Sequence, residues 1–122
     1  MTATYGQRKA LGDYGERLAE RELERQGLEV LDRNWRCEQG EIDIVARHGG
    51  ALVVCEVKTR TSDRYGAPVE AITPSKAARL HRLGFAWAKA HETTFDELRV
   101  DVVCVLLAPR SAAVLTYYPG LA

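Results

Sequence analysis

GEIDIVARHGGALVVCEVK, residues 40–58, decides the fold of this chain. Residues 40–46 and 52–58 both alternate with a period of two, which is typical of β-strands. The connection between them contains Gly49 and Gly50, and paired glycines favour the tight turn of a β-hairpin. The stretch therefore predicts an antiparallel hairpin with acids and a lysine inside otherwise strand-like runs.

A two-residue turn at Gly49 and Gly50 fixes which residues of the hairpin face each other. One face is then wholly apolar, and its pairs are Ala46–Val53, Ile44–Cys55 and Ile42–Val57. The other face contains the pairs Val45–Val54, Asp43–Glu56 and Glu41–Lys58. Facing residues have Cβ atoms roughly 4.5–5.5 Å apart, so we expect the carboxylates of Asp43 and Glu56 to lie close together.

The Asp43–Glu56 pair destabilises the hairpin or raises one pKa unless a cation lies between the two carboxylates. Mg²⁺ or Mn²⁺ fits, because such hard cations prefer oxygen ligands and use few protein carboxylates, completing their shell with water and substrate phosphate. Lys58 lies on the same face as Glu56 and can reach a phosphate oxygen. These residues suit metal-dependent hydrolysis of a phosphodiester, with Asp43 and Glu56 as ligands, Lys58 assisting and Glu41 as an accessory acid.

Asp43 followed by the tripeptide Glu56-Val57-Lys58 resembles the PD-(D/E)XK signature of restriction-endonuclease-like nucleases. More closely, five segments resemble the YraN-like family of bacterial endonuclease-like proteins: GE at 15–16, RNWR at 33–36, GEIDI at 40–44, EVKTR at 56–60 and RVDVV at 99–103. These segments extend over nearly the whole chain. One departure is Ile42, which replaces the proline of the broader signature. Proline there donates nothing to a metal and would interrupt a strand ladder.

The resemblance implies a restriction-endonuclease-like α/β fold related to Holliday-junction resolvases, with DNA, branched DNA in particular, as the substrate. In those relatives a glutamate of the first helix joins the metal site, and Glu16 is the matching position. From the residues alone, Glu16 either reaches the site past the small residues Gly12, Gly15 and Ala19 or lies on a solvated helix face. Resolvase relatives act as two-fold dimers, so a homodimer is also implied.

The remaining patterns predict one endonuclease-like domain over residues 1–122. Helices are expected at residues 9–26 and 74–91, the second capped by Thr73. Besides the hairpin, strands are expected at 28–33, 98–107 and 113–118, and loops at 34–39 and 59–72. Trp35, in the first of these loops, either stacks on a nucleic acid or packs on the core. The order α-β-β-β-α-β-β predicts a mixed β-sheet flanked by helices.

Charge is balanced over the chain, with 17 Lys and Arg against 17 Asp and Glu, but it is unevenly distributed. Basic residues exceed acids between residues 58 and 82. We expect salt-sensitive phosphate contacts from the basic residues near the site, which are Arg36, Arg60, Arg64, Lys76 and Arg79. Lys76, in the first turn of the second helix, is expected to have either a phosphate or a nearby carboxylate as its partner. Lys89 is expected on the solvated helix face.

The cysteines have no spacing typical of a zinc site or a disulfide framework. Cys55 and Cys104 are expected to be buried apolar residues and Cys37 to be exposed, and these thiols fit a reducing cytoplasm. No apolar run approaches the length that crosses a membrane, and the amino terminus does not resemble a signal peptide. The three histidines are expected in solvent. Asp101 is expected to form a salt bridge or to support the site, rather than to bind metal.

Three hypotheses remain. The first is a Mg²⁺- or Mn²⁺-dependent endonuclease that hydrolyses DNA without a small-molecule cofactor. The second is a non-catalytic nucleic-acid-binding or adaptor protein that keeps the nuclease fold. The third is a purely structural hairpin with a salt bridge between Glu41 and Lys58, which leaves the Asp43–Glu56 pair without an explanation.

Overall fold

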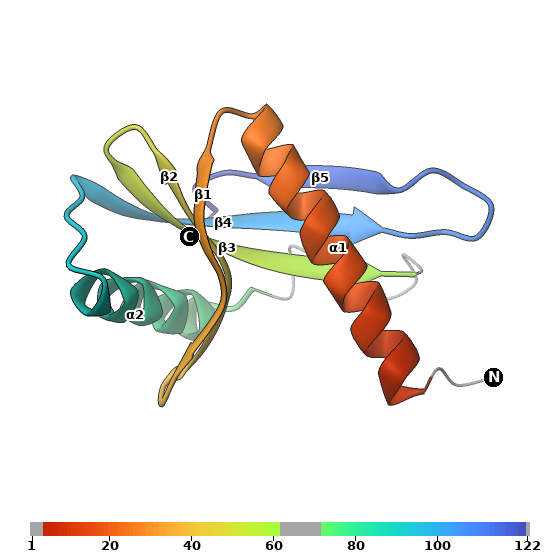
Figure 1. The fold of residues 1–122 in the computed structure, drawn as a ribbon, viewed down its shortest axis with the longest axis horizontal. Coiled ribbons are helices and arrows are strands. Elements are labelled where there is room, and N and C mark those ends of the chain that lie inside the picture. Colours follow the sequence, from red (N-terminus) through yellow and green to blue (C-terminus); the bar gives the residue numbers. More distant parts are fainter. Residues whose placement is uncertain (1–3, 62–71, 122) are drawn as a thin grey trace.

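The structure, a computed structural model, describes residues 4–61 and 72–121. Its elements are α1 (Tyr5–Arg25), β1 (Glu29–Cys37), β2 (Gly40–His48), β3 (Ala51–Arg60), α2 (Pro74–Ala90), β4 (Glu97–Leu106) and β5 (Val114–Tyr118). This order confirms the predicted α/β arrangement (Figure 1). The strands form a mixed sheet in the order β1-β2-β3-β4-β5, with β3 and β4 parallel and the other neighbours antiparallel.

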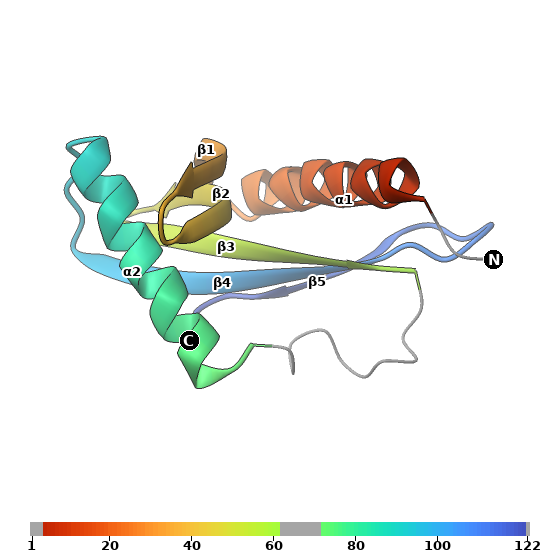
Figure 2. The same ribbon diagram turned by 90° about the horizontal axis from the view of Figure 1, so that it is seen from below.

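The two helices cover opposite faces of the sheet. Ala19 and Leu23 of α1 pack with one set of strand residues, which includes Ile44, Ala46, Val53 and Val103. Apolar residues of α2 pack with the alternate set, which includes Val45, Leu52, Val54 and Val100. Because β3 is covered on both sides, Ala51 to Cys55 are all buried. Figure 2 shows β1 and β2 rising between the two helices.

Side-chain caps set the ends of both helices. Thr4 and Gln7 form a reciprocal capping box, so α1 begins four residues earlier than residue 9, where the sequence pattern predicted it. After α1, Gly27 has a φ of +93°, a conformation that glycine adopts readily. In α2, Thr73 accepts a hydrogen bond from the Lys76 backbone N–H at 3.1 Å, and Pro74 occupies the first turn, as predicted.

The predicted loop at residues 34–39 was wrong, because β1 continues to Cys37. Its last pairs with β2 are Trp35–Ile42, Arg36–Glu41 and Cys37–Gly40. Gly40 has a φ of +140°, which helps the chain turn back immediately after Cys37. Trp35 packs against the α2-side core, with its ring edge-on to His91 at 6.1 Å between centroids. The structure therefore supports the core interpretation of Trp35.

Asp101 is fully buried in β4 and forms the expected salt bridge. Arg99 donates from Nε at 2.9 Å and from Nη2 at 3.0 Å, and the Gly120 backbone N–H donates at 2.8 Å. Tyr117 donates its hydroxyl to the same carboxylate. Burial and Asp101 raise the pKa of Tyr117 above its ordinary value, so this hydroxyl keeps its proton. The network joins β4 to β5 and to the chain after it.

The thiols and the histidines give a mixed result. Cys55 and Cys104 are buried, as predicted, whereas Cys37 is only half-exposed because it packs against the α2-side core. His91 is not simply solvated, since its ring stacks on Trp87 with 4.2 Å between centroids. Within residues 4–61 and 72–121, no helix is long and apolar enough to span a membrane.

Gly15 brings α1 close to Thr59 of β3. A Cβ added there would lie 2.0 Å from Thr59 Oγ1 and 3.0 Å from Thr59 Cβ. Gly15 and Ala19 are both buried, which confirms the predicted close approach of the helix to the sheet. Because Glu16 follows Gly15 directly, this approach determines how near Glu16 lies to the strands.

Replacing Gly15 by alanine is expected to lower the free energy of unfolding by about 1–3 kcal/mol, since the β-branched Thr59 must move. Gly12→Ala is the matched control. Its added Cβ meets nothing within 4 Å, and alanine favours the helix by about 0.5–1 kcal/mol over glycine. Urea unfolding of both variants measures the difference, and equal effects would show that the close contact is unimportant.

Candidate active site

The hairpin of β2 and β3 is regular near its turn and then opens. Its ladder runs from His48–Ala51 through Ala46–Val53 and Val45–Val54 to Ile44–Cys55. This confirms the two-residue turn and the register predicted from the sequence. Beyond Ile44 the ladder ends, so the predicted ladder pairs Ile42–Val57, Asp43–Glu56 and Glu41–Lys58 do not form between these described strands. We call this opening between β2 and β3 the fork.

The alternation of β2 changes at the fork. Ile44 packs in the α1-side core, but Ile42 packs in the α2-side core, although residues two apart in a regular strand share a face. The expectation that Ile42 and Ile44 lie on one apolar face was therefore wrong. On the opposite face Val45 and Val54 lie where they were predicted, and both are buried beneath α2. The part of the hairpin beyond the regular ladder contains Asp43, Glu56 and Lys58.

Asp43 lies in the fork, where its carboxylate takes the place of a backbone partner for Val57 of β3. Its Oδ2 accepts a hydrogen bond from the Val57 backbone N–H at 2.9 Å. Its side chain also interacts electrostatically with Glu56, so the two predicted acids do meet. Burial first, and then the charge of Glu56, raises the pKa of Asp43 to about 8, against the lowering effect of Val57.

Glu56 lies between two lysines. Lys58 Nζ is 3.9 Å from Glu56 Oε1, and Lys76 Nζ is 3.7 Å from Glu56 Oε2. All three side chains are largely buried, with exposed fractions of 15% for Lys58, 24% for Lys76 and 16% for Glu56. Burial, followed by the contact with Lys76, lowers the pKa of Lys58. Of the two partners expected for Lys76, the structure therefore supplies the carboxylate.

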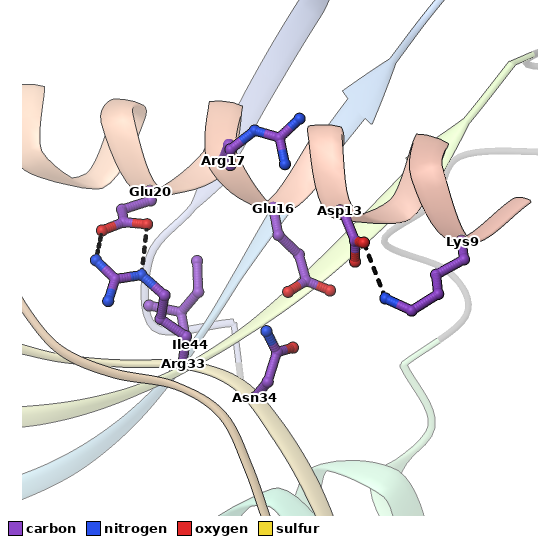
Figure 3. A pocket seen from close by; sticks show the side chains of 8 residues that line it. All are labelled: Lys9, Asp13, Glu16, Arg17, Glu20, Arg33, Asn34 and Ile44. Atoms are coloured by element: carbon purple, nitrogen blue, oxygen red, sulfur yellow. Dashed lines mark hydrogen bonds and ion pairs between the residues drawn. The ribbon is translucent and has the colours of Figure 1, made fainter. Parts of the chain in front are cut away.

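Glu16 of α1 and Glu41 of β2 lie near Asp43. Together with Asp43 and Asn34 they line a hollow of about 410 Å³ along α1. A second hollow of about 440 Å³ shares Glu16 and Asn34 and continues along the helix. Figure 3 shows Glu16 pointing from α1 toward Asn34 in this second hollow. Burial raises the pKa of Glu16, and the neighbouring Asn34 amide opposes that rise.

Asn34 lies at the site but was not among the residues predicted for it. It has a φ of +50°, inside β1, between the pairs Arg33–Ile44 and Trp35–Ile42, so the register places it opposite Asp43. Asparagine tolerates this left-handed conformation better than most residues. Its position coincides with the change of alternation in β2. An asparagine within a strand-like run was the available signal, but the predicted strand ended at Arg33.

The predicted nucleic-acid contacts occupy different positions. Arg36 is exposed and lies 3.4 Å from Glu41, so Glu41 does not pair with Lys58 and the purely structural hairpin is wrong in this respect. Arg60 is half-buried and donates from Nη1 to the Thr59 carbonyl at 3.1 Å. Arg79 is exposed on α2. Arg64 lies outside the described residues.

The donor set at the fork suits a hard divalent cation. Asp43 and Glu56 offer carboxylate oxygens, and a cation between them would offset the burial and the repulsion by Glu56 that raise the pKa of Asp43. Within the described ranges, no group of three or more His, Cys, Asp or Glu side chains has the arrangement of a metal site. The residues therefore fit Mg²⁺ or Mn²⁺, which need few protein ligands, better than the closed site of a structural zinc.

Stability of the metal-free protein is expected to fall as the pH rises from about 4 to about 8. The pKa of Asp43 is raised in the folded state from its ordinary value of 3.8. The folded state therefore holds a proton that the unfolded chain loses first, and the associated stability disappears by about pH 8. The loss is on the order of a few kcal/mol. Urea unfolding across this range measures the loss. If Asp43→Asn leaves the slope of the free energy of unfolding against pH unchanged, Asp43 is not the group responsible.

Comparisons with known proteins identify the family. The sequence model described as "Uncharacterised protein family UPF0102" matches residues 15–105. A UPF0102 protein of Nocardioides sp. is 49% identical over 114 residues, covering 93% of this chain and 92% of the relative. A UPF0102 protein of Kineococcus radiotolerans is 51% identical over 113 residues, covering 92% and 93%. The chain therefore belongs to the UPF0102 family, the YraN-like proteins.

Proposed function

We propose that this protein is a metal-dependent endonuclease that hydrolyses DNA phosphodiester bonds. The observation that carries the proposal is the fork, where Asp43 meets Glu56 while Lys58 lies 3.9 Å from Glu56. Two carboxylates and a lysine, brought together from adjacent strands, fit the PD-(D/E)XK signature that the sequence resembles. The mixed sheet with helices on both faces is compatible with that superfamily.

Asp43 and Glu56 would hold the metal, Mg²⁺ or Mn²⁺. When bound, such an ion supplies an activated water and neutralises charge on the phosphate oxygens. Val57 fixes the orientation of Asp43 through its backbone N–H. Lys58 neutralises the negative charge that develops on the phosphate. Glu16 and Glu41 line the adjoining hollow beside Asp43 and serve as accessory acids.

The resemblance to resolvases extends the proposal to branched DNA and to a two-fold dimer. Both stay predictions, as does a cytoplasmic location. Arg36, Arg60 and Arg79 stay predicted phosphate contacts, and the exposed side chain of Arg36 at the rim of the hollow supports its inclusion.

The function is tested by incubating the protein with linear, forked and four-way-junction DNA in Mg²⁺, in Mn²⁺ and in EDTA. The expected result is cleavage that requires metal and is fastest on branched substrates. A protein that binds these DNAs equally well with and without metal, and leaves them all uncut, would overturn the proposal.

A non-catalytic nucleic-acid-binding or adaptor protein is the second candidate. It is favoured by the positions of Lys58 and Lys76, which lie 3.9 and 3.7 Å from Glu56 and balance its charge without a metal. This candidate predicts DNA binding that weakens with salt, does not depend on metal and is unaccompanied by cleavage. The experiment above separates the two candidates.

A further inference from the structure

Lys76 comes from a different element than the other groups of the fork. It lies in the first turn of α2, whereas Glu56 and Lys58 belong to β3. Its ammonium nevertheless lies 3.7 Å from Glu56 Oε2, while Lys58 lies 3.9 Å from Oε1 of the same carboxylate. One carboxylate therefore has a lysine beside each of its oxygens.

Both distances are longer than those of a direct charge-assisted hydrogen bond, which are about 2.7–2.9 Å. Lys76 is therefore near Glu56 without a tight bond to it. The position is also unfavourable for a cation, because the start of a helix carries a partial positive charge. An additional anion beside Lys76 would remove this disadvantage, and 24% of the side chain is exposed to receive one.

The charges at the fork favour an anionic ligand once a metal is held. Asp43 and Glu56 contribute two formal negative charges, which Lys58 and Lys76 balance. Counted over these four side chains alone, a divalent cation then leaves a surplus of two positive charges. Glu56, Lys58 and Lys76 are largely buried, so electrostatic interactions there are less screened than in water. A phosphodiester gains negative charge as it is attacked, so this surplus stabilises the reacting group. Without Lys76, half of the surplus is lost.

We propose that Lys76 is a phosphate-binding residue of the site, which holds the scissile phosphodiester together with Lys58. The inference rests on the proposed nuclease function and deepens it. Lys76 then binds the phosphate that reacts. Its charge alone would suggest only a general contact with the DNA backbone.

The test compares Lys76→Met and Lys76→Gln with Lys76→Arg and with Lys89→Met. Lys89 lies in the last turn of the same helix and is exposed, so its replacement controls for the loss of one positive charge from α2. The first measurement is the salt dependence of binding to a branched DNA, with Ca²⁺ in place of Mg²⁺ under conditions that yield no cut product. The second is the cleavage rate in Mg²⁺.

Lys76→Met and Lys76→Gln are expected to reduce the slope of log K against log salt by about 1, the value for one lost phosphate contact. The Lys89→Met and Lys76→Arg variants should keep the wild-type slope. Cleavage by Lys76→Met should fall about 10²-fold, the lower end of the effect of removing one charge-stabilising group. Thermal unfolding confirms that each variant is folded.

The outcomes separate this inference from the proposed function. If the wild type cleaves DNA and the slope of the Lys76 variants is unchanged, the inference fails and the nuclease stands. If the slope falls at Lys76 alone but the wild type never cleaves, phosphate binding by Lys76 stands and the nuclease fails. Equal losses for Lys76→Met and Lys89→Met, or no DNA binding by the wild type, would overturn the inference.

Discussion

Replacing Asp43 by asparagine is expected to lower the rate of metal-dependent DNA cleavage by about 10²–10³-fold or more. The introduced amide retains a side-chain oxygen that can accept the hydrogen bond from Val57, which spans 2.9 Å in the wild type. The fork should therefore keep its shape, but it loses an anionic metal ligand. Cleavage of a labelled DNA substrate under single-turnover conditions measures the effect, and circular dichroism checks the fold.

Glu97→Gln is the control for this substitution. Glu97 is an exposed acid at the start of β4, and it pairs with Ala51 at the far end of β3 from Glu56. Its replacement should leave cleavage unchanged. Lys58→Ala should lose cleavage as Asp43→Asn does, because both act on the same phosphate. Wild-type rates for Asp43→Asn and Lys58→Ala would show that the site lies elsewhere.

Asp101→Ala is expected to lower the free energy of unfolding by about 3–5 kcal/mol, the typical cost of removing one partner of a buried ion pair. Asp101 is fully buried and accepts hydrogen bonds from Arg99, Tyr117 and Gly120. Without it, the Arg99 guanidinium, only 21% exposed, loses its counter-ion. Urea unfolding at neutral pH measures the loss.

Asp13→Ala is the matched control, since it breaks an exposed ion pair. The Lys9–Asp13 pair spans 2.9 Å, but its side chains are 60% and 45% exposed. Exposed pairs contribute about 0–1 kcal/mol, so the control should change stability little. If Asp101→Ala costs no more than Asp13→Ala, the buried network does not stabilise the fold in the way its geometry implies.

The order of elements and the hairpin register could be predicted because local patterns determine them. Gly49 and Gly50 mark the turn, and alternation fixes the pairs from Ala46–Val53 to Ile44–Cys55. The period-two pattern of the hairpin does not predict the fork, because the contacts found there involve residues that are distant in the sequence. Asn34 of β1 has a left-handed backbone conformation opposite Asp43, and where β2 and β3 separate the Asp43 carboxylate accepts a hydrogen bond from the Val57 backbone N–H. A period of two contains no information about either contact.

The candidate site was predictable in part for the same reason. Asp43, Glu56 and Lys58 lie close together in one hairpin. Two carboxylates and a lysine indicate metal-dependent hydrolysis of a phosphodiester. The approach of Lys76 to Glu56 depends on how α2 packs against the sheet, and the approach of Glu16 to Asn34 depends on how α1 packs. Tertiary packing decides both contacts. From the sequence, Glu16 could belong to the site or to a solvated helix face, and Lys76 could bind a phosphate or a carboxylate. No role was predicted for Asn34.

Calorimetric titration of Mn²⁺ into the metal-free protein and into Asp43→Asn tests the central claim most directly. If Asp43 and Glu56 hold a divalent cation at the fork, the wild type binds Mn²⁺ and the variant loses that binding. Proton release on binding should increase as the pH falls below about 8, because the pKa of Asp43 is raised to that value. A wild type that binds no Mn²⁺, or equal binding by both proteins, would contradict the account.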